Sequence, residues 1–167
     1  MKNGFTLTEL LVVAGIIFLM LGIVLANWRS GPAELQLQRT AHKLAQDIRR
    51  AGELAMSARE FQGAVPQGGY GIHFNFPSEN TSYILYADLN GNESYDGSDG
   101  VVETIFFEKG VFLKSITQNN LSVNFRPPSP KISIGGLSVA SITLGLESDQ
   151  TQTKIVNVNL AGLIEVE

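Results

Sequence analysis

Six oxygen-bearing side chains within residues 88–99 have a spacing that could bind a metal ion. With Asp88 as the first position, the others stand at the third, fifth, seventh, ninth and twelfth: Asn90, Asn92, Ser94, Asp96 and Asp99. A calcium loop of EF-hand type takes its ligands from these positions, with a backbone carbonyl at the seventh. Bound Ca²⁺ would also relieve the repulsion between closely spaced carboxylates. The spacing therefore predicts a calcium site.

Two residues of this segment depart from the EF-hand pattern. Gly91 is the fourth residue, whereas the pattern has glycine at the sixth, where this chain has Glu93. Asp99 is shorter than the usual glutamate at the twelfth position, and the flanking segments have the pattern of strands. The alternative is a solvated hairpin loop without metal, because turns favour Asp, Asn and Gly.

One further carboxylate, Glu9, lies in an otherwise uncharged apolar run at residues 5–26. A carboxylate inside a membrane-spanning helix costs about 2.5–3.5 kcal/mol at the membrane centre, so such residues usually have a function. Two simpler interpretations stay open. Glu9 could lie hydrated among lipid headgroups, or it could be stabilised by the helix dipole as an acid in the first turn.

The apolar run has the length of a transmembrane helix. At ~1.5 Å per residue, residues 5–26 would span roughly 33 Å, which matches a bilayer core of ~30 Å. Trp28 and Arg29 follow, where a membrane–water interface is expected, and Lys2 precedes the run, which favours a cytoplasmic N-terminus. A cleaved secretory signal is the alternative, but the apolar stretch is too long for one and the polar section before it too short.

The segment KNGFTLTELLVV resembles the processing site of type IV prepilins and type II secretion pseudopilins. Their pattern is a glycine, a phenylalanine, three residues and a glutamate at the start of a long apolar helix. The resemblance implies that residues 1–4 are a leader, that a prepilin peptidase cuts between Gly4 and Phe5, and that the new Phe5 amine is methylated. It also implies that Glu9 pairs with the Phe5 amine of a neighbouring subunit. Two charges poorly solvated in lipid gain from such a contact.

The rest of the chain predicts an α+β fold, in which a long N-terminal helix precedes a C-terminal antiparallel β-sheet domain. Gly31-Pro32 interrupts or kinks the helix, which then continues to residue 61. Its apolar positions form one stripe suited to packing on a sheet: Leu37, Ala41, Leu44, Ile48, Ala51, Ala55 and Ala58. Residues 62–167 contain short alternating or β-branched runs separated by turns, at 70–76, 83–87, 101–107, 111–116, 121–125, 139–146, 154–160 and 163–166.

The β-rich part resembles the GspH/FimT group of minor pilins and pseudopilins. The resemblance rests on AGELAMSAR, YGIHF, the acidic loop, NFRPPSP and the closing KIVNVNLAGLIEVE. It implies a structural subunit of a type II secretion pseudopilus or a type IV pilus. Its partners would be other pilin or pseudopilin subunits and an inner-membrane assembly platform. The subunit would sit in the inner membrane with its β-rich domain extracytoplasmic, on the periplasmic side, and then enter the filament.

Composition argues against several other functions. The chain has no cysteine, which excludes disulfides and thiol chemistry, and its histidines, His42 and His73, fall on different predicted elements. No nucleophile elbow, phosphate loop or zinc spacing is present, so we expect no enzyme. DNA uptake, which is associated with some FimT-like minor pilins through basic residues near the C-terminus, is the alternative function. Here the net charge is -4 and the tail reads GLIEVE, so nucleic-acid binding is not expected. A membrane-tethered adhesin that never polymerises is a third hypothesis.

Overall fold

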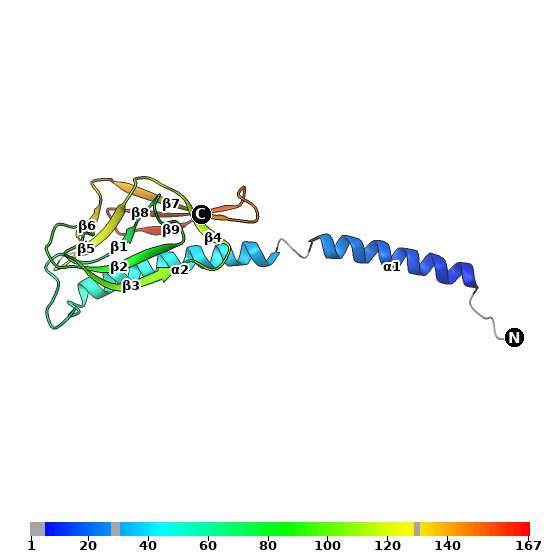
Figure 1. Cartoon of the computed structure of the whole chain (residues 1–167), viewed down its shortest axis with the longest axis horizontal. Helices are drawn as coiled ribbons and strands as arrows, with labels where there is room; N and C mark the ends of the chain where they lie inside the picture. The colour runs from blue at the N-terminus through cyan, green and yellow to red at the C-terminus, as the bar shows by residue number, and fades with distance from the viewer. Residues whose placement is uncertain (1–5, 28–30, 129–130) are drawn as a thin grey trace.

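A computed structural model describes residues 6–27, 31–128 and 131–167, without the side chains of residues 24–27, 31 and 32. Within these ranges two helices precede nine strands (Figure 1). The helices are α1 (Leu7–Asn27) and α2 (Gly31–Met56). The strands are β1 (Gly69–Phe74), β2 (Ser82–Asp88), β3 (Gly100–Phe106), β4 (Val111–Ile116), β5 (Leu121–Arg126), β6 (Lys131–Ile134), β7 (Val139–Leu146), β8 (Thr153–Asn159) and β9 (Ile164–Val166). The predicted α+β class with antiparallel pairing is confirmed.

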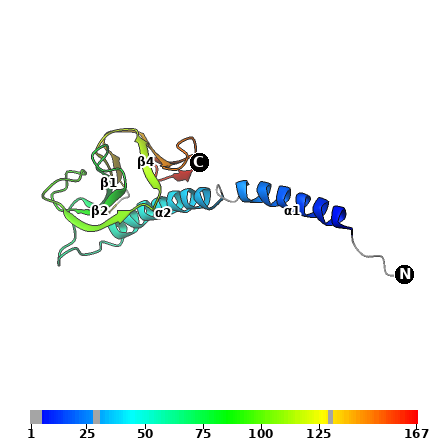
Figure 2. The same cartoon turned by 45° about the vertical axis from the view of Figure 1, so that its right-hand side comes forward.

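The strands form two antiparallel sheets. The five-stranded sheet has the order β3-β2-β1-β5-β6, and the four-stranded sheet has the order β4-β7-β8-β9. Strand β6 was missing from the prediction because its four residues are too few to show an alternation. A single helix, α2, contacts strands of both sheets and lies against them in both views (Figures 1 and 2).

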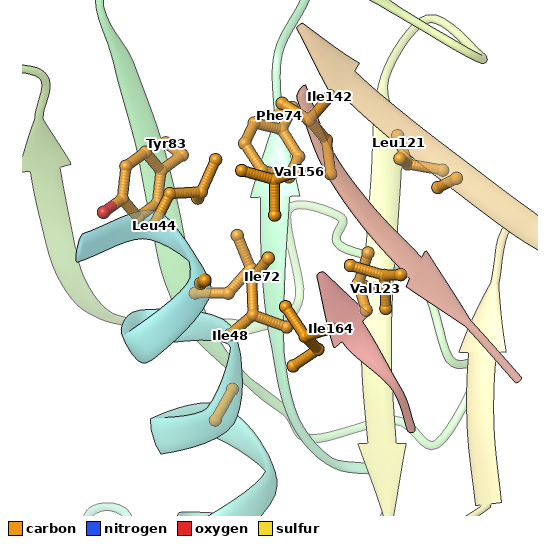
Figure 3. Packing of buried hydrophobic residues seen from close by; sticks show 14 of the residues in the cluster. Leu44, Ile48, Ile72, Phe74, Tyr83, Leu121, Val123, Ile142, Val156 and Ile164 are labelled. Carbon is orange, nitrogen blue, oxygen red and sulfur yellow. The ribbon is translucent and has the colours of Figure 1, made fainter. Parts of the chain in front are cut away.

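One continuous hydrophobic core joins α2 to both sheets. Six of the seven predicted stripe residues, from Leu37 to Ala55, are at most 2% exposed. Leu44 and Ile48 on α2 meet Ile72 and Tyr83 of the five-stranded sheet (Figure 3). Asp47, a charged residue outside the predicted stripe, is also buried. It accepts a hydrogen bond of 2.6 Å from the Tyr83 hydroxyl.

The second helix ends earlier than predicted, at Met56 instead of residue 61. Ala58 has a φ of +47°, the amide of Ala58 donates to the carbonyl of Ala55, and the amide of Arg59 donates to the carbonyl of Leu54. This pair of bonds is a Schellman motif, which closes a helix with a residue in the left-handed region. Ala58 is therefore exposed, and the prediction that it belongs to the buried stripe was wrong.

The apolar side chains that the structure describes on α1 are exposed. Its large hydrophobic residues, including Leu7, Phe18 and Ile23, are between 48% and 82% exposed. No helix in the described part of the chain is identified as long and apolar enough to cross a membrane. The predicted membrane segment, residues 5–26, begins at Phe5 and includes side chains 24–26, which lie outside the described part.

Candidate assembly helix and acidic loop

Glu9 takes part in closing the first turn of α1. The Glu9 amide donates to Thr6 Oγ1 at 3.3 Å, and Glu9 Oε2 accepts from the Thr6 amide at 3.4 Å and from the Thr6 hydroxyl at 3.3 Å. This reciprocal arrangement is a capping box, whose sequence signature is Ser or Thr followed three residues later by Glu or Gln. The sequence alone did not lead us to assign a role to Thr6, although the segment TLTE has the Thr-x-x-Glu spacing of a capping box. The capping box gives Glu9 a local structural role in the isolated subunit.

Four residues of the predicted processing site and interface lie outside the described residues: Gly4, Phe5, Trp28 and Arg29. The predicted cleavage and the pairing of Glu9 with Phe5 therefore stay predictions. What the structure adds is the position of Glu9 in the first turn of a helix whose side chains are exposed and apolar.

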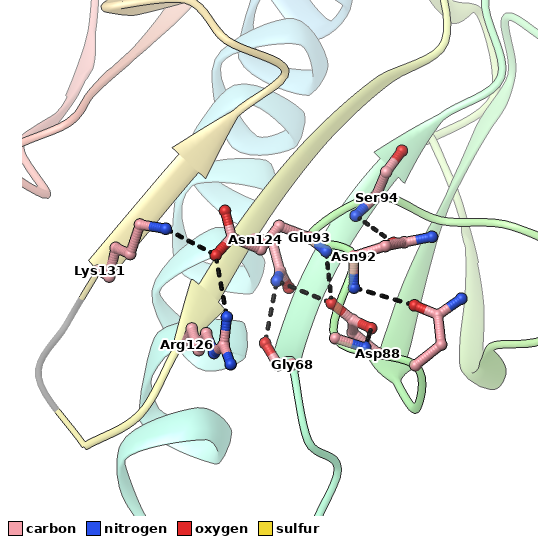
Figure 4. Close-up of polar contacts among 10 residues, drawn as sticks. Gly68, Asp88, Asn92, Glu93, Ser94, Asn124, Arg126 and Lys131 are labelled. Atoms are coloured by element: carbon pink, nitrogen blue, oxygen red, sulfur yellow. Dashed lines mark hydrogen bonds and ion pairs between the residues drawn. The ribbon is translucent and has the colours of Figure 1, made fainter.

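The acidic loop between β2 and β3 is organised around Asp88, which is completely buried. Asp88 Oδ1 accepts the Gly91 amide at 2.6 Å, while Oδ2 accepts the Glu93 amide at 2.8 Å and Asn124 Nδ2 at 3.2 Å. Asn124 Nδ2 also donates to the carbonyl of Gly68 (Figure 4). A buried carboxylate is costly unless hydrogen-bonded, and these donors meet that need. Asn124 belongs to β5, so no local pattern in the sequence indicated it.

The other predicted ligands form hydrogen bonds within the loop. Asn90 Oδ1 accepts the Asn92 amide, and Asn92 Oδ1 accepts the Ser94 amide. The side-chain amides of Asn90 and Asn92 both donate to Asp96 Oδ2, at 2.9 and 2.7 Å. Asp99 accepts the amides of Leu89 and Asp96. The structure therefore brings these residues into one loop, where their oxygens already accept N–H donors.

Glu93 occupies the position where an EF-hand has glycine, and its φ is +64°. The backbone thus makes a turn of the kind that usually requires glycine, at a cost in strain. The Glu93 carboxylate lies 2.8 Å from Lys131 Nζ and 3.4 Å from Arg126 NH1 (Figure 4). The Lys131 ammonium holds the pKa of Glu93 below its usual value. The departure from the pattern at this position is compensated by contacts with β5 and β6.

Two carboxyl groups of the loop have pKa values shifted in opposite directions. Hydrogen bonds from Ser98, with help from Asn90 and Asn92, lower the pKa of Asp96 to about 2. Burial raises the pKa of Asp99, and the nearby charges of Asp88 and Asp96 raise it further. A divalent cation would favour the ionised form of Asp99.

The acidic loop meets the requirements of a calcium site only in part. Among the described residues, no group of three or more His, Asp or Glu side chains is placed to hold a metal ion. A calcium ion in this loop would have to take amide, hydroxyl and backbone oxygens as well, which calcium accepts. The calcium site thus stays a prediction.

The loop also covers the outer face of the five-stranded sheet. Ser122 Oγ lies 2.9 Å from His73 Nδ1 and accepts the Tyr95 amide at 3.1 Å. The ring of Tyr95 lies 4.8 Å from that of His73 and 5.3 Å from that of Tyr86. This cover explains why every residue of β1 is buried, where a sheet with one solvated face would show alternation. Burial lowers the pKa of His73 to about 4, so the ring is neutral at pH 7.

Comparison with known proteins gives one match. The chain is 32% identical over 107 residues to the pilin-like protein PilA1 of Thermus thermophilus. The chain is thus similar to a pilin-like protein. The match supports the predicted type IV pilin-like family at this general level. It does not resolve the GspH/FimT group within that family.

The similarity to the pilin-like relative covers 63% of this chain and 60% of the relative, so the chain spans about three-fifths of that protein's length. No protein-family description and no solved structure matches the chain. The comparison and the structure thus show similarity to a pilin-like protein and an α+β fold with a leading helix.

Proposed function

We propose that this protein is a structural subunit of a pilus-like filament, either a type II secretion pseudopilus or a type IV pilus, and a minor pilin or pseudopilin within it. The observation that carries the proposal is α1, a helix of 21 residues whose exposed surface is apolar, joined to a β-rich globular part in a pilin-like chain. Such a surface requires a covering of lipid or of other helices. A filament subunit uses both in turn.

In this proposal residues 5–26 anchor the precursor in the inner membrane and later pack in the filament core. A prepilin peptidase removes residues 1–4 and methylates Phe5, and an inner-membrane platform assembles the subunits. Glu9 of one subunit then pairs with the Phe5 amine of its neighbour. The Thr6–Glu9 hydrogen bonds of 3.3–3.4 Å are long for contacts to a carboxylate. A nearby ammonium group would therefore compete well for the same oxygens. The role is structural, and no catalytic step is assigned to the chain.

Intact mass after co-expression with a prepilin peptidase tests the processing step. We expect the mass of residues 5–167 plus one methyl group. A full-length mass in the presence of an active peptidase would contradict the proposal. Cleavage after the small residue Ala26, where a secretory signal would be cut at the end of the apolar run, would instead indicate a secreted protein and remove the anchor.

A pair of Glu9 variants separates the role of its charge from its role in the capping box. Glu9→Gln keeps a side chain that can accept the Thr6 hydrogen bonds, because Gln also serves in capping boxes. It removes the charge that would meet the Phe5 amine. We expect Glu9→Gln to reduce filament recovery as strongly as Glu9→Ala while both variants are still cleaved. Normal assembly of the Glu9→Gln variant would show that capping is the only role of this residue.

Calcium binding by the acidic loop is a separate hypothesis. It is tested by thermal melting of the purified chain in millimolar calcium and in chelator, with Asp96→Asn as the comparison variant. If the loop binds calcium, the ion raises the melting temperature of the wild type and raises that of the variant less, because binding to the folded state stabilises it. An unchanged melting temperature of the wild type would contradict calcium binding by this loop.

A further inference from the structure

One aromatic side chain of the globular part is unusually exposed. Phe106, at the end of the edge strand β3, is 66% exposed, more than any other large hydrophobic residue that the structure describes outside α1. Its strand neighbour Ile105 is buried in the core, so Phe106 points to the opposite face of the sheet. A large aromatic ring held on a rigid strand is the kind of group that dominates protein interfaces.

An apolar pocket lies on another side of the same molecule. Its volume is about 380 Å³, and it opens between α2, the β5–β6 pair and the turn before β9. Most of the lining is apolar or small, and two charged residues of α2 complete it: Met56, Phe125, Ile132, Ile164, Gly52, Ala161 and Gly162, with Arg49 and Glu53. Pockets of this size and composition bind apolar groups.

Charges near the pocket complement those beside Phe106. Arg49 and Glu53, one helical turn apart, line the pocket, and the Arg49 guanidinium is fixed by a hydrogen bond of 2.9 Å to the Ile164 carbonyl. Two residues after Phe106 comes the exposed pair of Glu108 and Lys109. The pocket lining and the segment after Phe106 thus each carry one cation and one anion, which allows opposite charges to meet across the contact. Complementary charges at the rim favour this partner over others.

Phe106 and the pocket lie at opposite edges of the five-stranded sheet, since β3 forms one edge and the pocket borders β6 at the other. Phe106 and the pocket also lie at different positions along the axis of α2. Glu103 of β3 is bonded to Arg50, and Tyr83, the partner of Ile105 in the sheet, is bonded to Asp47. Phe106 therefore lies near or before the turn of Asp47, whereas the pocket is lined by residues 49–56 of α2. At ~1.5 Å per residue the offset is about 10 Å.

We propose that Phe106 of one copy of this chain inserts into the α2–β6–β9 pocket of a second copy. The two contact surfaces are different parts of the molecule, so the contact is heterologous, and such contacts build open helical arrays unless the rotation closes. In an array whose axis runs along α2, the offset of about 10 Å becomes the rise from one copy to the next. The inference rests on the proposed filament role and extends it by assigning the neighbour and the contact.

Cysteine cross-linking of the full chain tests this contact, and the natural chain contains no other thiol. Thr104→Cys, on the same face of β3 as Phe106, and Ala161→Cys are introduced together so that the Phe106 ring stays in place. Cells co-expressing a prepilin peptidase and the assembly machinery are then treated with an oxidant. Ala161 is exposed and lines the pocket. We expect a ladder of dimers, trimers and larger products, because each copy carries both halves of the contact. Mixing the two single variants should give dimers only.

The control pairs Thr104→Cys with Val65→Cys, another exposed residue, which is not among the pocket residues. It should give no ladder. An uncross-linked Thr104→Cys/Ala161→Cys variant that is nevertheless recovered in filaments would overturn this contact and leave the filament role intact. Uncleaved chains that never enter filaments would instead overturn the proposed function. Cross-links from Thr104→Cys to a different protein would overturn the assignment of a second copy.

Truncation of the ring gives an independent measurement. Phe106→Ala should lower the association between subunits about tenfold or more, the loss typical of an aromatic anchor. Its melting temperature should stay near that of the wild type, because the ring is exposed. Thr104→Ala, an exposed position on the same strand, is the matched control and should assemble normally. Equal assembly of the two variants would contradict the proposal.

Discussion

Asp88 offers the sharpest test of how the acidic loop is held. Its carboxylate is completely buried and accepts three donors, the amides of Gly91 and Glu93 and the side chain of Asn124. Asp88→Ala removes all three acceptor contacts. Hydrogen bonds to a charged group contribute about 1.5–3 kcal/mol each, and a buried donor without a partner costs about 1–3 kcal/mol. Water can reach the two loop amides once the loop opens, so we expect a total loss of about 3–5 kcal/mol.

The assay is urea unfolding of the full chain in detergent, followed by circular dichroism, with chelator present so that calcium makes no contribution. Asp88→Asn keeps the shape but replaces one acceptor oxygen by a donor, so it should lose about 1–3 kcal/mol. Asp96→Ala serves as the matched control, because Asp96 is an acid of the same loop that is not buried like Asp88, and its effect should be much smaller. An Asp88→Ala variant within about 1 kcal/mol of the wild type would refute the reasoning.

Three further predictions concern the rest of the globular part. Ala58→Gly should stabilise the protein by about 1 kcal/mol in the same unfolding assay, because Ala58 has a φ of +47° and glycine adopts that region without strain. Its control, Ala55→Gly inside the helix, should destabilise the protein. The pKa of His73 is about 4 in the folded chain and near 6.5 when unfolded, so its contribution to stability should be complete above pH 6.5 and fall by about 3 kcal/mol by pH 4. A pH series of melting temperatures should show this loss in the wild type and not in His73→Asn. Gly68→Ala should prevent the acidic loop from closing, since a Cβ there would collide with the Asp88 carboxylate. Proteolysis within residues 89–99 should therefore be faster than in the control variant Gly97→Ala, where the added Cβ meets nothing.

Periodic features were the part of the fold that the sequence predicted well. The apolar spacing from Leu37 to Ala55 identified the buried face of α2, because a regular helix converts sequence spacing into a spatial stripe. The helix end was misplaced because Ala58 adopts a backbone conformation that alanine does not signal. Strand β6 was missed because four residues are too few to show an alternation.

Contacts between distant segments were the part that the sequence did not predict. The spacing from Asp88 to Asp99 correctly marked one connected loop, yet the role of Asp88 depends on Asn124, thirty-six positions later. Asp47 is buried for the same kind of reason, since the Tyr83 hydroxyl that pairs with it comes from another element. In both cases a polar residue looks like a surface residue until its partner is known, because only a hydrogen-bonded partner makes its burial tolerable.

The way α2 is fastened has a mechanical consequence. Arg50 and Asp47 bond the helix to the five-stranded sheet through Glu103 and Tyr83, while Arg49 bonds it to the Ile164 carbonyl in the four-stranded sheet. A pulling force on the N-terminal end of α2 is therefore carried at once by both sheets and by their common core. In contrast, a hairpin that is pulled from one end loses its hydrogen bonds one after another. The domain should yield only when its core opens as a whole, and a pulling experiment should record one large rupture instead of a series of small ones.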